Sequence, residues 1–223
     1  PDVDEVFAKE CSKKENQLHI VREKNVSNYR YDSDLQYFDY GEMKDIAVNL
    51  KGMVQIRNAS ICIEAMKILK DKGYEVLDES IREGLKTVIH KARMEKLLSK
   101  PFIVYDGAHN MPAMENLQSM VDMYYSDFDR VYIVSILKSK DYRKMLKILA
   151  SDKEGKFIFT SGNDAERYVD GNTLCECMKE YVGEDRTCTM TLEDAIISTK
   201  GYDENTVNLV VGSFYLYGDV VRT

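Results

Sequence analysis

The sequence predicts an α/β protein: a Rossmann-like C-terminal domain with a mostly parallel sheet at residues 99–223, preceded by an incomplete α/β piece at residues 1–98. Two observations predict this division. Beyond residue 100, runs of apolar, β-branched and aromatic residues alternate with amphipathic segments, which is typical of buried parallel strands connected by helices. The first hundred residues are polar, tyrosine-rich and alternating instead, which suits antiparallel strands with one solvated face.

In the second half, each apolar run is followed by a helical pattern. A helix is expected from about Pro112, because apolar side chains recur there at helical spacing. Its expected core-facing residues are Ala113, Leu117, Met120, Val121 and Tyr124. The expected strands are "FIVYD" (102–106), "RVYIVSIL" (130–137), "KFIFTS" (156–161), "TCTMT" (187–191) and "TVNLVVGSF" (206–214), and further helices are expected at 142–150, 171–182 and 192–200. The crossovers between such strands should be right-handed.

The first half has its own pattern. The segment 17–41 predicts antiparallel strands, and helices are expected near residues 58–72 and 79–90. Gly73 is a favourable helix stop. We place the boundary between the two parts after residue 98, shortly before Pro101.

The amino-acid composition indicates a globular protein and argues against two other classes. The chain has 223 residues, 44% of them hydrophobic and 31% charged, which is a globular balance. The formal net charge of -7 argues against a general nucleic-acid binder, and no apolar stretch is long enough to suggest a membrane helix. Five cysteines without a metal-binding or disulfide spacing suggest reduced thiols in a cytoplasmic protein.

Polar residues gather where the predicted parallel strands end. Ligands bind beyond the carboxyl ends of such strands, and the sequence there runs Asp106-Gly107-Ala108-His109-Asn110 after the first strand. An aspartate suits a pair of ribose hydroxyls, a histidine can donate to a phosphate or carboxylate, and Asn110 can cap the next helix. The alternative is structural: an ordinary Asp-Gly turn followed by an ordinary helix cap.

The order of these residues resembles a known signature. "DGAHN" after an apolar strand is similar to the motif of the folylpolyglutamate synthase and dihydrofolate synthase family, within the Mur ligases. Other elements resemble that family in the same order along the chain. They are "LKGMVQIRNA" from Leu50, "KARMEKL" with Arg93 and Glu95, "KSKDYRKML" with Lys140 and Asp141, and "GSFYLYGDV" with Gly212, Ser213, Tyr215, Leu216 and Gly218. Three positions depart from the family pattern: Met111 replaces a proline, Ala92 a glycine and Asp219 a glutamate.

The resemblance implies an activity. Enzymes of the family use ATP to convert a carboxylate into an acyl phosphate, which the amine of an incoming amino acid attacks to form an amide. The implied substrates are folate or dihydropteroate and L-glutamate, and the implied cofactors are ATP and Mg2+. The parent enzyme is expected to be a cytoplasmic monomer.

The resemblance also implies roles for individual residues. Asn58 would lie against adenine, Arg93 would reach the ATP phosphates, and Asp106 would hold the ribose. His109 would sit beside nucleotide and substrate, as the candidate catalytic residue. The carboxylates of glutamate would be bound by Ser213, Asn110 and Lys140. Structural alternatives are a helix cap for Asn58, an ion pair with Glu95 for Arg93, and a satisfied strand-end hydroxyl for Ser213.

One family element does not occur in this sequence. Nothing matches the phosphate loop Gly-x-x-x-x-Gly-Lys-Ser/Thr, and the nearest string, Gly155-Lys156-Phe157, continues into a predicted strand. Family members carry that loop, their magnesium ligands and most of the folate site upstream. The chain also opens on Pro1 without an initiator methionine. The resemblance therefore implies the C-terminal fragment of a ligase, inactive on its own, with the Mg2+ ligands upstream of this chain. In that fragment, residues 1–98 would be the C-terminal part of the central ATPase domain, without its phosphate loop, and residues 99–223 the Rossmann-like C-terminal ligase domain.

Two other functions stay open. The chain could be a standalone Rossmann-like nucleotide-binding or scaffolding module without ligase activity. The upstream coding sequence distinguishes the two, since a phosphate loop in frame favours the ligase and a start codon directly before Pro1 favours the module. A hydrolase using His109 with Asp106 is disfavoured, because the sequence has no nucleophile elbow.

Overall fold

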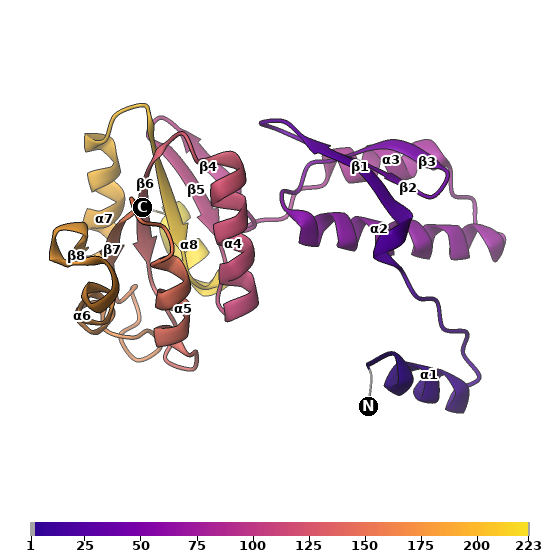
Figure 1. Ribbon diagram of the computed structural model, residues 1–223, viewed down its shortest axis with the longest axis horizontal. Coiled ribbons are helices and arrows are strands. Elements are labelled where there is room, and N and C mark those ends of the chain that lie inside the picture. Colours follow the sequence, from indigo (N-terminus) through magenta and orange to yellow (C-terminus); the bar gives the residue numbers. More distant parts are fainter. Residues whose placement is uncertain (1–2, 223) are drawn as a thin grey trace. The chain divides into compact units, whose positions relative to one another are not determined.

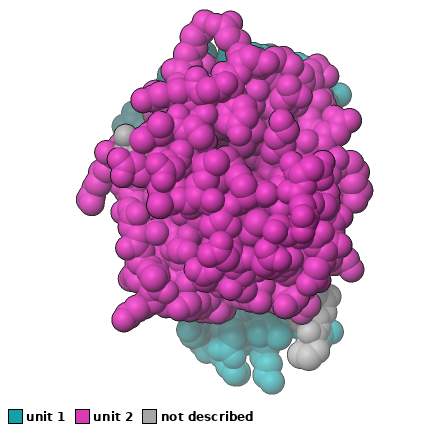
Figure 2. Space-filling view, turned by 90° about the vertical axis from the view of Figure 1, so that its left-hand side faces the viewer, with its two compact units in different colours: residues 1–49, 53–87 teal, residues 50–52, 88–223 magenta. Residues whose placement is uncertain are grey.

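The computed structural model describes residues 3–222, which fold as two compact units (Figures 1 and 2). Unit 1 comprises residues 1–49 and 53–87, and unit 2 comprises residues 50–52 and 88–223. The predicted boundary after residue 98 falls inside unit 2, within strand β4 (Glu95–Ser99). That strand belongs to unit 2 because it pairs antiparallel with β5 (Phe102–Asp106). Pro1, noted above for the start of the chain, lies outside the described residues.

Unit 1 contains a three-stranded antiparallel sheet in the order β1-β2-β3. Helices α2 and α3 pack against β3. The core of the unit consists of buried apolar side chains from the strands and helices: Phe38, Tyr40, Ile46, Val48, Ile56, Ala59, Ile63 and Ile81. The elements are α1 (Val3–Lys13), η1 (Glu23–Asn25), β1 (Val26–Tyr31), β2 (Gln36–Tyr40), β3 (Met43–Val48), α2 (Met53–Asp71) and α3 (Asp78–Thr87).

Helix α2 begins five residues earlier than the pattern predicted. Gly52, directly before it, has φ +98°, a left-handed conformation that glycine adopts at low cost. The chain therefore turns at Gly52 and enters the helix at Met53, which places Asn58 in the second turn. Helix α3 ends at Thr87, three residues before the predicted end at His90.

Unit 2 is built on a six-stranded sheet in the order β4-β5-β9-β6-β7-β8. All neighbouring strands are parallel except the β4–β5 pair, as expected for a mostly parallel sheet. The remaining elements are α4 (Met111–Tyr124), β6 (Asp129–Val134), α5 (Tyr142–Leu149), β7 (Lys156–Phe159), α6 (Gly171–Val182), η2 (Glu184–Arg186), β8 (Thr187–Thr189), α7 (Leu192–Ser198), η3 (Thr199–Gly201), β9 (Thr206–Val211) and α8 (Phe214–Arg222).

Helices cover both faces of this sheet (Figure 1). Buried side chains of α4, α5 and α6 form one core with one face of the strands, and those of α7 and α8 form a second core with the other face. The chain moves in one direction from β5 through β6 and β7 to β8, and then returns to place β9 between β5 and β6. Right-handed crossovers put the helix of the return connection on the opposite face, which explains the position of α7.

Several of these helices begin at the carboxyl edge of the sheet and have a polar N-cap side chain. The side chain of Asn110 accepts the N–H of Ala113 at 3.0 Å and so caps α4. Asp141 caps α5 by accepting the N–H of Lys144, and Asp170 caps α6. Such caps satisfy N–H groups that have no partner within the helix.

At the amino edge of the same sheet, the buried carboxylate of Asp152 connects several segments through hydrogen bonds. Arg130 at the start of β6 donates to both oxygens of Asp152, at 2.7 and 3.1 Å, and the Tyr132 hydroxyl donates to Oδ2 at 2.7 Å. The backbone N–H groups of Glu154 and Gly155 donate to Oδ1. These hydrogen bonds lower the pKa of Asp152 to about 2, against the opposing effect of burial.

Two further properties concern membranes and thiols. Within residues 3–222, no helix combines the length and hydropathy needed to cross a membrane. All five cysteines are free thiols, as the sequence predicted.

Candidate functional site

The carboxyl ends of four parallel strands lie level with one another in unit 2. Asp106 is in register with Val211, and Val211 is in register with Val134. Val134 is in turn in register with Phe159 of β7. Backbone hydrogen bonds continue one step further, from Gly212 N to Asp106 O and from Ser135 N to Val211 O. The sheet thereby brings together the strand-end segments that the sequence singled out.

Asp106 is a buried acid at this edge, with 5% of its surface exposed. Its Oδ2 atom accepts the N–H of Met94 at 3.0 Å, so the side chain ties the turn before β4 to the end of β5. Burial raises the pKa of Asp106 to about 6, although the backbone N–H groups of Met94 and Ala108 and the nearby Arg93 oppose the shift. A carboxyl group with a pKa displaced toward neutrality at a strand end is typical of a functional site.

Gly107 is required by a close approach of three segments. Its N–H donates to the carbonyl of Ala92 at 2.8 Å. A Cβ atom at Gly107 would lie 3.1 Å from the ring of Phe214 and 3.2 Å from the Ala92 carbonyl oxygen. Any larger residue would push the turn at residues 92–94 and the start of α8 away from β5.

The turn at residues 92–94 presents Arg93. Ala92 and Met94 have φ values of +59° and +43°, and Ala92 N donates to Glu95 Oε2 at 2.7 Å. Glu95 also accepts the hydroxyl of Tyr217, and within residues 3–222 it forms no ion pair with Arg93. The structure therefore does not contain the Arg93–Glu95 pair that the sequence left open, and the half-buried guanidinium packs instead 4.8 Å from the ring centroid of Phe214.

His109 also packs against the ring of Phe214. Its ring centroid is 5.8 Å from that of Phe214, with an edge-on angle of 62°. Nδ1 lies 2.8 Å from the carbonyl oxygen of Gly107. Because a carbonyl only accepts, Nδ1 carries the hydrogen, and in a neutral ring Nε2 keeps its lone pair. The half-buried imidazole is thus oriented with Nε2 available to a ligand.

Asn110 and Ser213 both act as caps here. Asn110 is exposed and caps α4, which is the structural alternative considered for it. Ser213 is 3% exposed, and its Oγ accepts the N–H of Tyr215 at 3.2 Å in the first turn of α8. The carbonyl of Ser213 accepts the hydroxyl of Tyr105 at 2.7 Å. Both residues begin helices whose N-terminal N–H groups favour an anion.

The remaining two candidates are Asn58 on α2 and Lys140 after β6. Asn58 belongs to unit 1, is exposed on α2, and donates from Nδ2 to Gln55 Oε1 at 3.1 Å. Since it is in the second turn of α2, the proposed helix cap is wrong for Asn58. Lys140 follows β6, with its N–H bonded to the carbonyl of Leu137 and a half-buried side chain.

Sequence reasoning missed two residues of the cluster. Phe214 contacts Gly107, Arg93 and His109, and its ring centroid is 6.4 Å from that of His90. His90 was expected at the end of the helix near residues 79–90, whereas α3 ends at Thr87 and leaves His90 outside the helix. The available signal for Phe214 was its place directly after Ser213 in "GSFYLYGDV".

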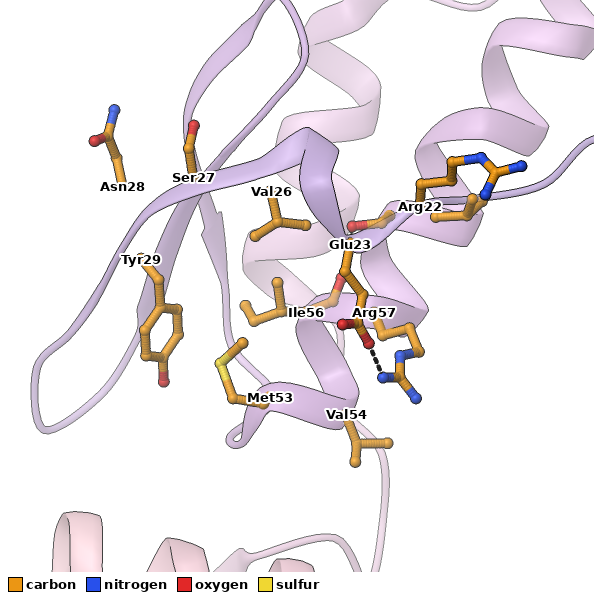
Figure 3. Close-up of a pocket in the computed structure, with 12 residues that line it drawn as sticks. Arg22, Glu23, Val26, Ser27, Asn28, Tyr29, Met53, Val54, Ile56 and Arg57 are labelled. Atoms are coloured by element: carbon orange, nitrogen blue, oxygen red, sulfur yellow. Dashed lines mark hydrogen bonds and ion pairs between the residues drawn. The ribbon is translucent and has the colours of Figure 1, made fainter.

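A separate pocket of about 650 Å³ lies in unit 1, between β1 and α2 (Figure 3). Val26, Met53 and Ile56 point into it, and Arg57 and Glu23 form an ion pair at its side. None of its lining residues is a predicted site residue.

Metal ligands were expected upstream of this chain. Within residues 3–222, no group of three or more His, Cys, Asp or Glu side chains is arranged to hold a metal ion. We assign no residue of this chain to Mg2+.

Comparison with known proteins identifies the family. The model of the family described as "Mur ligase, glutamate ligase domain" matches residues 92–214, which is more than half of the chain and includes Arg93, the "DGAHN" segment and Ser213. The chain belongs to this family. The resemblance inferred from the five short motifs is thereby confirmed, as is the α/β fold class.

Curated relatives and solved structures agree with this assignment. The folylpolyglutamate synthase of Lacticaseibacillus casei is 32% identical over 151 residues, covering 65% of this chain and 35% of the relative. The dihydrofolate synthase/folylpolyglutamate synthase of Bacillus subtilis is 28% identical over 182 residues, covering 79% of this chain and 40% of the relative. The chain therefore spans well under half the length of these two curated relatives.

Among solved structures, folylpolyglutamate synthase from Mycobacterium tuberculosis, complexed with ADP and AMPPCP, matches with a TM-score of 0.81 at 22% identity. The match covers 98% of this chain and 52% of that structure. The folylpolyglutamate synthase of Thermotoga maritima matches with a TM-score of 0.75 at 26% identity, covering 98% and 50%. The fold of residues 3–222 is thus that of one half of these enzymes.

Proposed function

We propose that this chain supplies the glutamate-ligase half of an ATP-dependent enzyme that joins L-glutamate to folate or dihydropteroate. The observation that carries the proposal is the cluster at the carboxyl edge of unit 2. It gathers a buried acid, a half-buried guanidinium and an oriented imidazole beside the N-termini of two helices. The names of the relatives, and the ADP in a related structure, support the choice of glutamate and nucleotide as ligands.

The electrostatics of the cluster suit a nucleotide. Arg93 is a permanent cation without a hydrogen bond or ion pair among residues 3–222, so its donors can meet phosphate oxygens. Asp106 accepts the Met94 N–H on one oxygen, and a carboxylate retains further acceptor sites for ribose hydroxyls. We assign these two residues to nucleotide binding, with Asn58 of unit 1 as the candidate adenine contact.

The groups on the other side of the cluster suit the amino acid. The N-termini of α4 and α8, capped by Asn110 and Ser213, favour the negative charge of glutamate carboxylates. Lys140 adds a positive charge after β6. His109 has Nε2 free to accept a proton, so we assign it to the attacking amine.

These groups would act on an acyl phosphate, which activates the folate carboxylate by giving it a good leaving group. ATP supplies that phosphoryl group when bound. The residues of this chain then bind glutamate, orient its amine and accept a proton as the amide bond forms and phosphate leaves. No step of this proposal uses a metal ligand from residues 3–222.

Calorimetry of ATP and ADP binding tests the nucleotide part. We expect weak binding by the wild-type chain and a loss of roughly tenfold or more in affinity for Asp106→Ala and Arg93→Gln, because each removes a charged hydrogen-bonding group. Asp122→Ala, which removes an exposed carboxylate on α4, is the control and should bind as the wild type does. Equal affinity in all four proteins would contradict the assignment.

The ligase part has its own test. Purified chain mixed with ATP, L-glutamate and either dihydropteroate or a folate monoglutamate should show no ADP release, because the family phosphate loop does not occur in its sequence. The same mixture with a relative's full-length enzyme is the positive control. Turnover by this chain alone would overturn the proposal that it is only one half of the ligase.

A further inference from the structure

The ring of Phe214 joins three segments that are distant in the sequence. It begins α8, directly after Ser213, and it packs against the turn carrying Arg93 and against the segment carrying Gly107 and His109. Its exposed fraction is 39%, so one part of the ring is covered by these contacts and another part reaches the surface. The side chain thus bridges the β9–α8, β5–α4 and 92–94 connections at the carboxyl edge.

The contact with Phe214 is important for Arg93 because few other interactions fix the position of the guanidinium. Among residues 3–222, Arg93 forms no hydrogen bond and no ion pair, and the ring lies 4.8 Å from its Cζ atom. A guanidinium packed over an aromatic face is attracted by the ring, and the contact restricts the many conformations that a free arginine has. The contact with the ring uses no N–H donor of Arg93 in a hydrogen bond, so these donors remain for an anion.

The contact with His109 completes an orientation that the backbone begins. The hydrogen bond from Nδ1 to Gly107 O fixes one atom of the imidazole, but rotation about that bond remains. The edge-on contact with Phe214, at 62° between the ring planes, limits this rotation. Two constraints on one imidazole specify where Nε2 points.

We propose that Phe214 is a positioning residue that holds Arg93 and His109 in the arrangement required for their ligand. It acts through these two side chains and needs no contact with the reacting atoms. The identity of the ligand rests on the proposed function, whereas the positioning of the two side chains can be measured without any ligand.

Proton NMR of the imidazoles tests the ring contacts on which the positioning depends. The chain contains three histidines, so three sets of ring signals are expected, and His109→Gln and His90→Gln assign them. An aromatic ring shifts the signals of nearby protons, so Phe214→Leu should move the His109 and His90 signals and leave His19, which belongs to unit 1, unchanged. Phe214→Tyr keeps the ring and should leave all three signals close to their wild-type positions.

Two further variants show whether a changed signal comes from loss of the ring or from loss of the folded structure. Phe214→Met fills more of the space of the ring and should give the same loss of the His109 shift as Phe214→Leu. Tyr215→Leu removes the neighbouring aromatic side chain, which packs over Arg167 rather than Arg93, and should leave the His109 signal in place. An unchanged His109 signal in a folded Phe214→Leu or Phe214→Met chain would overturn the proposal.

Binding of ADP supplies the second readout. If the wild-type chain binds ADP, we expect roughly tenfold weaker binding by Phe214→Leu and near wild-type binding by Phe214→Tyr, since only the first loses the ring. Equal binding by the two variants would overturn the positioning of Arg93. If the wild-type chain does not bind ADP, the nucleotide assignment fails, and the imidazole signals still decide the role of Phe214.

Discussion

Two buried carboxyl groups lie at opposite edges of one sheet, and their pKa values are shifted in opposite directions. Asp152 at the amino edge accepts hydrogen bonds from Arg130, from Tyr132 and from two backbone N–H groups, and its pKa is lowered to about 2. Asp106 at the carboxyl edge accepts hydrogen bonds from backbone N–H groups alone, with Arg93 and His109 nearby, and burial raises its pKa to about 6. The first group stabilises the fold, whereas the second is kept charged at neutral pH at a cost in stability.

The difference extends to the neighbouring groups. At the amino edge, Arg186 donates to the carbonyls of Asp152 and Gly155, so these two acceptors are paired as well. At the carboxyl edge, the buried hydroxyl of Ser135 has no hydrogen-bond partner among residues 3–222. Polar groups left unpaired in a buried place lower stability, and they are retained where a ligand can use them.

The largest effect is expected from Asp152→Ala. The substitution leaves Arg130 and the Tyr132 hydroxyl buried without their acceptor, and breaking such a pair costs about 3–5 kcal/mol of the free energy of unfolding. Urea unfolding followed by the NMR signals of unit 2 measures it. Asp122→Ala serves as the exposed control, and a loss below about 1 kcal/mol would show that the network is not structural.

A pH series separates the two acids further. Because its folded pKa of about 6 lies above the ordinary value, Asp106 contributes stability below about pH 4, and this is lost as the pH rises through 6. Asp106→Asn should therefore raise the free energy of unfolding of unit 2 at pH 8, by up to about 3 kcal/mol, and give little gain at pH 4. A gain that is equal at both pH values would contradict the shifted pKa.

Asp152 has the opposite sign and a different window. Its folded pKa of about 2 lies below the ordinary value, so its contribution is present above about pH 4 and is lost as the pH falls toward 2. As the pH falls from about 4 to about 2, the free energy of unfolding of the wild-type chain should decrease by about 2 kcal/mol more than that of Asp152→Asn. Unfolding in urea at pH 2.5 and pH 5 distinguishes the two proteins, and identical pH slopes would refute the assignment.

The smallest effect on stability is expected from Gly107→Ala. The added Cβ would meet the Phe214 ring and the Ala92 carbonyl, both within 3.2 Å, so the three segments must separate slightly, at a cost of about 1 kcal/mol. ADP binding should weaken in parallel, because Arg93 and His109 are held by the same contacts. Gly218→Ala, whose Cβ would meet nothing within 4 Å, is the matched control for the substitution.

Local patterns predicted much of unit 2 and of the site. The apolar run 102–106 gave β5, Asn110 was identified as a helix cap, and "DGAHN" with four other motifs indicated the family. These signals lie within short stretches of sequence. They needed no knowledge of which strands become neighbours.

The missed features all depend on long-range packing. The return of β9 between β5 and β6 brings Phe214 against Gly107, and nothing near Phe214 in the sequence reports its distant partner. The pairing of β4 with β5 moved the boundary between the units to residues 87 and 88. The burial that shifts the pKa of Asp106 likewise exists only once the turn at Met94 closes over it.

The central claim is that the buried Asp106 carboxylate binds a ligand and lowers the stability of the fold. The most direct measurement is hydrogen exchange of the unit 2 amides at pH 8, for wild type and Asp106→Asn, with and without ADP. We predict that the variant exchanges more slowly than wild type without ADP, and that ADP slows exchange only in the wild type. Faster exchange in the variant without ADP, or equal protection of both proteins by ADP, would contradict the claim.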